Sequence, residues 1–306
     1  MGEKTASMAG RAGVALPRAV LRLARPRQWL KNLLVFAALL FARKLGDPAA
    51  VRAAVVGFVA FCLLASATYA MNDVLDVERD RAHPRKRRRP IASGALSVTG
   101  GAAASVAFAA AGVAIASTLP VGFLVAALVY VALTLFYSLQ GKNLPILDIL
   151  LIAAGFVVRA VAGALAIDVP SSNWFVTCTL FAAIFLALCK RRAEIGALEA
   201  DAGRHRPVLA VYPIPFLQGL TSASMAAMMI SYALYVFDVR ARAGVAFHGI
   251  ELTLPCVVYG LFRYVWLVET KGYGGSPEEV LLRDRGIQVA SLLFVAIAAI
   301  ALRHSG

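Results

Sequence analysis

The chain has 306 residues, of which 60% are hydrophobic, and its formal net charge at pH 7 is +14. A soluble domain would be about half apolar, so this composition excludes an ordinary soluble protein. Lysine and arginine in cytoplasmic loops orient membrane helices, so the positive charge does not indicate nucleic-acid binding and we expect no nucleic-acid partner. Apolar stretches of about 20 residues, the length that a bilayer-spanning helix needs, recur along the chain. We therefore predict an all-α, polytopic protein of the lipid bilayer.

Nine transmembrane helices are expected from these apolar stretches. Residues 1–24 are basic and rich in small residues, without a continuous apolar core, and are expected to form a cytoplasmic N-terminal segment. Residues 25–306 would then form one transmembrane catalytic domain. The predicted spans are 28–43, 52–75, 97–118, 120–139, 145–168, 173–190, 211–238, 250–268 and 286–303.

The distribution of basic residues predicts the orientation of these spans. With nine spans, the N-terminus and the loops after spans two, four, six and eight share one side of the membrane. That side holds most of the 31 lysine and arginine residues. Because such an excess marks the cytoplasmic side, we expect a multi-pass protein of the plasma (inner) membrane. Its N-terminus is expected in the cytoplasm and its C-terminus outside.

Four oxygen-bearing side chains gather at the cytoplasmic end of the second predicted span, namely Asn72, Asp73, Asp76 and Asp80. A helix turns by about 100° per residue, so the four share a stripe of roughly a quarter turn. Carboxylates this close repel one another unless a cation lies among them. Mg²⁺ binds such hard oxygen ligands, often together with substrate phosphates. The spacing therefore predicts a metal–phosphate site, and the alternative is a polar helix end that runs into a solvated loop.

Basic side chains that could bind phosphate follow in the sequence. A dense basic run comes directly after the aspartates, and within it Lys86 and Arg89 are candidates for holding phosphate oxygens. A second cluster, from Lys190 to Glu194, is expected on the same side of the membrane. Its i,i+3 and i,i+4 spacings also suit a simple salt bridge on a helix surface, so both interpretations stay open.

The fifth predicted span carries a charge near its middle, Arg159. A buried arginine there needs an anionic partner or a water-filled cavity. We favour a cavity-facing phosphate or carboxylate over a side chain that snorkels to the surface. Asp148, near the start of the same span, could be a helix cap, an ionic partner or a ligand.

These motifs resemble those of the UbiA superfamily of intramembrane transferases. The similarity rests on the aspartate motif at 72–80, on the stretch from His83 to Gly94, and on the opening Arg25-Pro26…Trp29…Lys31-Asn32. The resemblance implies a UbiA-type bundle of nine helices with its active site at the cytoplasmic side. The family's second motif, after helix six, is usually rich in aspartate, whereas this sequence reads Lys190-Arg191-Arg192-Ala193-Glu194 there.

This departure is similar to the branch of decaprenyl-phosphate phosphoribosyltransferases. That branch carries Lys-Arg-x-x-Glu at the same place, and a late stretch matched here by Pro277-Glu278 and by Leu282 to Arg285. Resemblance to the branch implies Mg²⁺-dependent transfer of 5-phosphoribosyl from phosphoribosyl diphosphate (PRPP) to a polyprenyl phosphate such as decaprenyl phosphate. Diphosphate would be released, and the product would serve the synthesis of cell-wall arabinan (arabinogalactan) precursors.

The motifs and the resemblance together give the expected site. Asp73, Asp76 and Asp80 are the expected catalytic residues, and with Asn72 they are the expected ligands of Mg²⁺. Substrate-binding side chains are expected at Lys31, Asn72, Lys86, Arg89, Tyr137, Lys142, Arg159, Lys190, Arg191 and Glu194.

Two other functions stay open beside phosphoribosyl transfer. One is an aromatic prenyltransferase that uses a prenyl diphosphate donor, although the basic second cluster argues against it. The other is a transporter or channel for anionic metabolites. Transporters often show internal repeats or broken midplane helices, and the sequence shows no clear repeat and places its charge clusters at one surface. The oligomeric state is also open, with a homo-oligomer among the alternatives.

Overall fold

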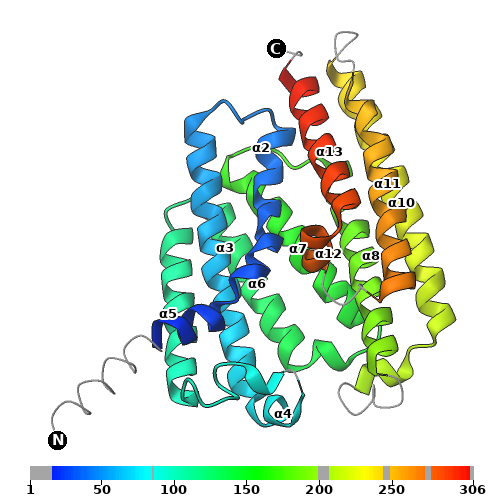
Figure 1. Ribbon diagram of the computed structural model, residues 1–306. Coiled ribbons are helices and arrows are strands. Elements are labelled where there is room, and N and C mark those ends of the chain that lie inside the picture. Colours follow the sequence, from blue (N-terminus) through cyan, green and yellow to red (C-terminus); the bar gives the residue numbers. More distant parts are fainter. Residues whose placement is uncertain (1–15, 85, 199–206, 244–248, 273–276, 304–306) are drawn as a thin grey trace, which may run out of the picture.

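The computed structural model describes residues 16–84, 86–198, 207–243, 249–272 and 277–303. Within these ranges the chain is helical and has no β-strand (Figure 1). A helical stretch at residues 16–24 comes first. The elements that follow, with 3-10 helices labelled η, are η1 (Pro26–Phe36), α2 (Ala37–Phe41), α3 (Pro48–Leu75), α4 (Val77–Ala82), η2 (Lys86–Arg88), α5 (Val98–Ala116), α6 (Val121–Leu139), η3 (Gly141–Asn143), α7 (Leu147–Ala166), α8 (Asn173–Leu198), η5 (Pro207–Val211), α10 (Ile214–Ala243), η6 (Ile250–Thr253), α11 (Leu254–Lys271), α12 (Pro277–Arg283) and α13 (Arg285–Arg303).

Of the described helices, seven are long and apolar enough to cross a membrane. They are α3, α5, α6, α7, α8, α10 and the continuous stretch formed by η6 and α11. Helix α13 is apolar as well but shorter, over residues 285–301. These eight segments coincide with predicted spans two to nine. The all-helical class is therefore confirmed, while the count of nine spans stays a prediction.

The first predicted span, 28–43, is not a single α-helix. It consists of the eleven-residue 3-10 helix η1 followed by the five-residue α2. A 3-10 run of this length is uncommon and often marks a functional or strained segment. The segment is held inside the bundle, where it packs against α3 and α7. A side chain at Gly163 of α7 would collide with the carbonyl oxygen of Val35, so the backbones of η1 and α7 lie in direct contact.

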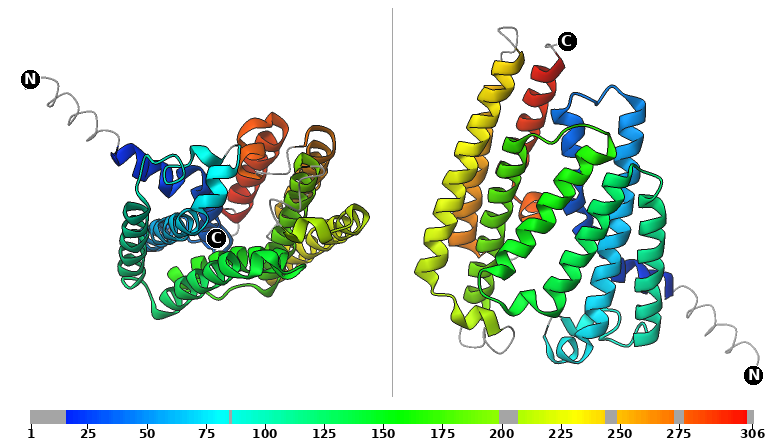
Figure 2. Two further views of the ribbon diagram at one scale, coloured as in Figure 1. Left: turned by 90° about the horizontal axis from the view of Figure 1, so that it is seen from below. Right: turned by 180° about the vertical axis from the view of Figure 1, so that it is seen from behind.

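The long helices follow one another around the bundle in roughly chain order (Figure 2). The packed neighbours are α3 with α5, α6 with α7, α7 with α8, α8 with α10, and α11 with α13. A core of aromatic side chains lies between η1, α3, α6 and α7, with the Phe61 ring centre 5.6 Å from that of Phe123 and 5.2 Å from that of Tyr130. At one end of the bundle lie α4, η3 and the C-terminal end of α8 (Figure 1).

Local signals set the starts of α3 and α7. Asp47 caps α3 by accepting from the amides of Ala49 at 3.0 Å and Ala50 at 3.2 Å. Helix α7 begins directly after Ile146, a β-branched residue with a φ of +67°. That conformation is strained for a residue other than glycine. The hydroxyl of Tyr212 accepts the Ile146 N–H at 2.6 Å, which holds the turn in place.

Candidate active site

The predicted aspartate motif lies where α3 meets α4. Asp73 is near the end of α3, Asp76 is the single residue between the two helices, and Asp80 belongs to α4. Helical hydrogen bonds continue across the junction, from Asp76 N to Asn72 O at 2.9 Å and from Asp80 N to Asp76 O at 2.8 Å. Asp73 and Asp80 are each 2% exposed. The structure therefore forms the predicted stripe and withdraws two of its carboxylates from solvent.

One guanidinium group joins the two buried carboxylates. Nη1 of Arg89 lies 3.0 Å from Oδ1 of Asp73 and 2.6 Å from Oδ2 of Asp80. Arg25 donates from Nη2 to the same Oδ1 of Asp73. Burial lowers the pKa of the Arg25 guanidinium, and the neighbouring Asp73 carboxylate opposes that shift. Because arginine titrates far above neutral pH, the Arg25 guanidinium stays charged beside Asp73.

The sequence did not assign Arg25 to the site. Its backbone lies in the left-handed region, with a φ of 52° and a ψ of 62°. For a residue other than glycine that conformation costs about 1–3 kcal/mol and is found mainly at functional sites. The turn is pinned to α3 on both sides, because Ser66 Oγ donates to Ala24 O at 2.9 Å and accepts from Trp29 Nε1 at 3.1 Å. The Arg25-Pro26 pair in the family-like opening motif was the available signal.

The third carboxylate, Asp76, is half-buried and faces a different set of cations. Lys142 of η3 places its Nζ 3.3 Å and 3.4 Å from the two carboxylate oxygens. Arg79 adds a longer ion pair at 3.6 Å. The amide of Asn72 makes no hydrogen bond with the described part of the chain. The prediction that Lys142 and Asp76 belong to one site is consistent with this geometry.

The second predicted cluster lies at the end of α8. Arg191 is fully buried and forms an ion pair with Glu194. Its Nε lies 2.8 Å from Oδ2 of Asp148, but off the direction of a hydrogen bond, and its Nη2 donates to the hydroxyl of Tyr137 at 3.3 Å. Arg191 thus contacts three protein groups, and it positions Glu194 and Tyr137. The solvent-accessible cation of the cluster is Lys190, whose Nζ lies 4.0 Å from Oε1 of Glu194.

Of the three roles left open for Asp148, the structure gives it the role of an ionic partner. It is fully buried and pairs with Arg191. Its Oδ1 also accepts from the hydroxyl of Tyr212 at 2.6 Å. Burial, together with this hydrogen bond, raises the pKa of Tyr212 to about 12, so the phenol keeps its proton at neutral pH. The sequence did not indicate Tyr212, because it lies 64 residues from its partner and in no motif.

Two further lysines, Lys86 and Lys31, lie close to these clusters. Lys86 lies within electrostatic range of Asp76, Asp80 and Glu194. Lys31 of η1 lies within range of Lys190, and its Nζ donates to Gln28 Oε1 at 2.5 Å. The structure therefore brings most of the predicted substrate-binding residues to one end of the bundle, with cations from η1, η2, η3 and α8 around three carboxylates.

Arg159 lies apart from this group. It is 5% exposed and its hydrogen-bond partners are neutral. Nε donates to Asn32 Oδ1 at 2.8 Å, Nη1 to Gly155 O at 2.9 Å, and Nη2 to Tyr130 Oη at 2.7 Å. Its guanidinium carbon also lies 4.4 Å from the centre of the Tyr130 ring, within the range of a cation–π interaction. The expected anionic partner is not among these groups, and Arg159 instead anchors η1 to α7 through Asn32.

The donor set of the aspartate motif fits a Mg²⁺ ion. Three carboxylates and one amide oxygen are hard ligands of the kind that Mg²⁺ binds together with phosphate oxygens. In the structure arginines occupy the space between the carboxylates, and no three His, Cys, Asp or Glu side chains among the described residues form a metal-sized cluster. One buried oxygen, Oδ2 of Asp73, has no hydrogen-bond partner. The motif therefore keeps an unsatisfied acceptor that suits a cation.

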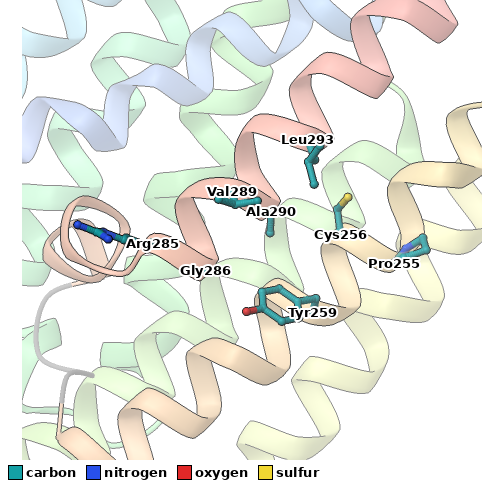
Figure 3. Close-up of a pocket in the computed structure, with 8 residues that line it drawn as sticks. All are labelled: Pro255, Cys256, Tyr259, Arg285, Gly286, Val289, Ala290 and Leu293. Carbon is teal, nitrogen blue, oxygen red and sulfur yellow. The ribbon is translucent and has the colours of Figure 1, made fainter.

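Two hollows described in the structure lie away from the aspartates. One, of about 500 Å³, lies between α11 and α13 (Figure 3). The other, of about 320 Å³, includes Arg43 and Asp238 among its lining residues. Guanidinium groups lie against the carboxylates of the polar site, and charge and hydrogen bonding mark its position.

An all-helical bundle with apolar spans and a carboxylate–cation site at one end defines a class of membrane-embedded proteins. The sequence profile of the UbiA prenyltransferase family matches residues 32–275. The chain belongs to this family, and the seven long apolar helices of its described residues make it an integral membrane protein.

Two relatives are similar over nearly the whole chain. The decaprenyl-phosphate phosphoribosyltransferase of Mycolicibacterium smegmatis is 36% identical, over 94% of this chain and 93% of its own. That of Corynebacterium glutamicum is also 36% identical, over 90% of this chain and 84% of its own. Among solved structures, a UbiA homolog from Archaeoglobus fulgidus bound to GPP and Mg²⁺ superposes with a TM-score of 0.72 at 22% identity. That similarity covers 93% of this chain and 99% of the homolog, and it confirms the UbiA fold.

Proposed function

We propose that this protein transfers the 5-phosphoribosyl group of PRPP to a polyprenyl phosphate such as decaprenyl phosphate, with Mg²⁺, and releases diphosphate. The supporting observation is its 36% identity to two decaprenyl-phosphate phosphoribosyltransferases along almost their full length. The composition of the candidate site also supports this reaction, because three carboxylates and several lysines share one end of the bundle. Such a mixture suits a donor that carries two phosphate groups and arrives with a divalent cation.

The residues divide into two groups in this reaction. Asp73, Asp76 and Asp80, with Asn72, would hold Mg²⁺, which neutralises charge on the leaving diphosphate. An oxygen of the lipid phosphate attacks C1 of the ribose, the bond from C1 to the diphosphate breaks, and the diphosphate leaves with the electron pair. No strong general base is required, because the lipid phosphate is already anionic at neutral pH. The cations around the carboxylates bind and orient the phosphate groups.

Individual roles follow from exposure. Lys190, Lys142, Lys31 and Lys86 are reachable cations that can hold the 5-phosphate or the lipid phosphate. Glu194 can bind ribose hydroxyls. Arg25 and Arg89, which pair with Asp73 in the structure, are placed to bind the diphosphate when the carboxylates bind a cation. The product would serve cell-wall arabinan synthesis.

The function is tested by direct assay. Purified full-length protein is incubated with labelled PRPP, decaprenyl phosphate and MgCl₂, and lipid-linked phosphoribose is measured. We expect product that depends on both substrates, that is lost on addition of EDTA, and that returns with excess Mg²⁺. Absence of product would exclude the proposal. GPP-bound relatives of the same fold make an aromatic prenyltransferase the second candidate, and prenylation of an aromatic acid from geranyl diphosphate in a parallel reaction would favour it.

The proposal includes an orientation in the plasma (inner) membrane: nine spans, residues 1–24 and the aspartate end in the cytoplasm, and the C-terminus outside. The exposed residues Ser93, in the α4–α5 connection, and Thr118, in the α5–α6 connection, test it. In intact cells, a membrane-impermeant thiol reagent should label the Thr118→Cys variant and spare Ser93→Cys. The four native cysteines, which are buried or half-buried, require a background measurement on the unmodified protein. The opposite labelling pattern would reverse the orientation.

A further inference from the structure

One buried hydroxyl contacts the segments that carry both charge clusters of the candidate site. Tyr212 follows η5 directly and is 7% exposed. Its hydroxyl donates to Oδ1 of Asp148 and accepts from the Ile146 N–H, each at 2.6 Å. Ile146 directly precedes α7 and Asp148 lies in its first turn. The hydroxyl therefore joins parts of the protein to one another instead of facing a ligand.

The first hydrogen bond reaches the short turn between η3 and α7. Pro145 O accepts from the Leu147 N–H at 2.7 Å, and Ile146 between them has a φ of 67° and a ψ of -48°. This geometry is that of a γ-turn with positive φ, which is rare and strained. Such a conformation persists where the surrounding structure holds it. The Tyr212 hydroxyl does so by binding the N–H of the strained residue itself.

This turn determines where Lys142 lies. Lys142 belongs to η3, four residues before Ile146, and its Nζ reaches the two carboxylate oxygens of Asp76 at 3.3 Å and 3.4 Å. A side chain at Gly141 would collide with that of Leu151, so η3 lies directly against α7. The path of the chain through the γ-turn therefore sets the position of Lys142, and with it one cation of the aspartate motif, relative to α7.

The second hydrogen bond leads to the α8 cluster, which consists of Lys190, Arg191 and Glu194. The Asp148 carboxylate is fully buried, and while Tyr212 holds its Oδ1, the Nε of Arg191 lies 2.8 Å from its Oδ2. Arg191 in turn forms an ion pair with Glu194. Tyr212 thus fixes the orientation of the carboxylate against which Arg191, and through it Glu194, is placed.

Apolar packing keeps the phenol ring in place. The Tyr212 ring belongs to a buried cluster with Val208, Leu188, Ile149 and Leu217, which come from η5, α8, α7 and α10. The 3-10 helix η5 also packs against both η3 and α8. The hydroxyl is therefore a fixed point from which the chain leads to Lys142 on one side and to Arg191 on the other.

We propose that Tyr212 is a positioning residue that matches the separation between the aspartate motif and the α8 cluster to the length of the donor. This rests on the proposed function. PRPP carries a diphosphate on C1 and a phosphate on C5 of one ribose, so the groups that bind its two ends must lie a fixed distance apart. The aspartate motif takes the diphosphate end, and the α8 cluster takes the phosphate end. Binding both ends at once strengthens binding only where the separation fits.

The test compares the donor with its two halves in the full-length protein. Tyr212→Phe removes the hydroxyl and keeps the ring. KM is measured for PRPP, and inhibition constants are measured for diphosphate with Mg²⁺ and for ribose 5-phosphate. We expect KM for PRPP to rise about tenfold or more and each inhibition constant to change less than about threefold, because each half contacts one cluster only. The matched control is Tyr232→Phe, which removes an equally buried hydroxyl, 7% exposed and 2.7 Å from Thr253 Oγ1 in a different core cluster. It should change none of the three constants.

The outcomes separate this proposal from the proposed function. Lack of phosphoribosyl transfer by the unmodified protein overturns both. With transfer present, an unchanged KM for PRPP in Tyr212→Phe overturns the positioning role alone. So does a parallel rise in KM and in both inhibition constants, because that pattern would show a general loss of structure. If Tyr212→Phe does not fold, it is combined with Ile146→Gly, since glycine adopts a positive φ without strain, and the same three constants decide.

Discussion

Replacement of Asp73 by asparagine is expected to reduce phosphoribosyl transfer by about a thousandfold, the size of effect seen when a group that stabilises transition-state charge is removed. Asp73 is 2% exposed and pairs with both Arg25 and Arg89, and its second oxygen has no hydrogen-bond partner. The amide keeps the shape of the side chain but removes the charge that would bind Mg²⁺. The rate is measured with saturating PRPP and decaprenyl phosphate.

The control for that variant is another carboxylate from the same part of the chain. Glu78 lies in α4, is 78% exposed at its side chain and pairs only with Arg81 among the described residues. Glu78→Gln should therefore keep the activity of the unmodified protein. Circular dichroism and thermal unfolding in detergent show whether each variant is folded. Activity of a folded Asp73→Asn close to that of the unmodified protein would remove Asp73 from the catalytic machinery.

Replacement of Arg191 by methionine is expected to lower the free energy of unfolding by about 3–5 kcal/mol, as when one partner of a buried ion pair is removed. Arg191 and Asp148 both have fully buried side chains, so the variant takes a buried guanidinium group away from the Asp148 carboxylate. Activity should fall as well, because Glu194 and Tyr137 lose the side chain that positions them. Thermal unfolding of the purified variants measures the stability.

A second substitution, at Asp148, tests whether the loss of stability comes from the buried charge or from the loss of the arginine side chain. The double variant Arg191→Met with Asp148→Asn should recover most of the lost stability, since both charges of the buried pair are then removed together, while transfer stays low. The control is Arg81→Met, which breaks an exposed pair with Glu78 and should cost less than about 1 kcal/mol. Equal loss in the single and double variants would contradict a stabilising role for the Arg191–Asp148 pair.

The sequence could predict the helices that cross the bilayer but not the form of the first one. Runs of about 20 apolar residues are a signal of length and composition, and eight of them reappear as apolar helices. In the first span, η1 winds as a 3-10 helix because it is fitted between α3 and α7. That fit depends on Gly163, more than 120 residues away, where any side chain would collide with Val35. A pattern read along the chain cannot contain such a contact.

In the candidate active site, too, local spacing could be predicted from the sequence and tertiary contacts could not. Spacing alone predicted the stripe of Asp73, Asp76 and Asp80, because those residues are neighbours on one helical path. The partners of the charges depend on tertiary structure. Arg25 meets Asp73 across 48 residues, and Arg159, expected near an anion, finds Asn32 across 127 residues. The polar groups of the motif were thus predictable, whereas the choice between a substrate contact and an internal pair required the fold.

The balance of charge at the aspartates has a consequence for the order in which ligands arrive. In the described part of the chain, three carboxylates of this motif are met by four cationic side chains, namely Arg25, Arg79, Arg89 and Lys142. The cluster is therefore not a purely acidic site that would bind divalent cations from solution by itself. A lone cation would add charge to a group that is already positive on balance. Substrate and metal are favoured as one anionic complex, so the concentration of the donor, and not that of free Mg²⁺, governs how often the site is filled.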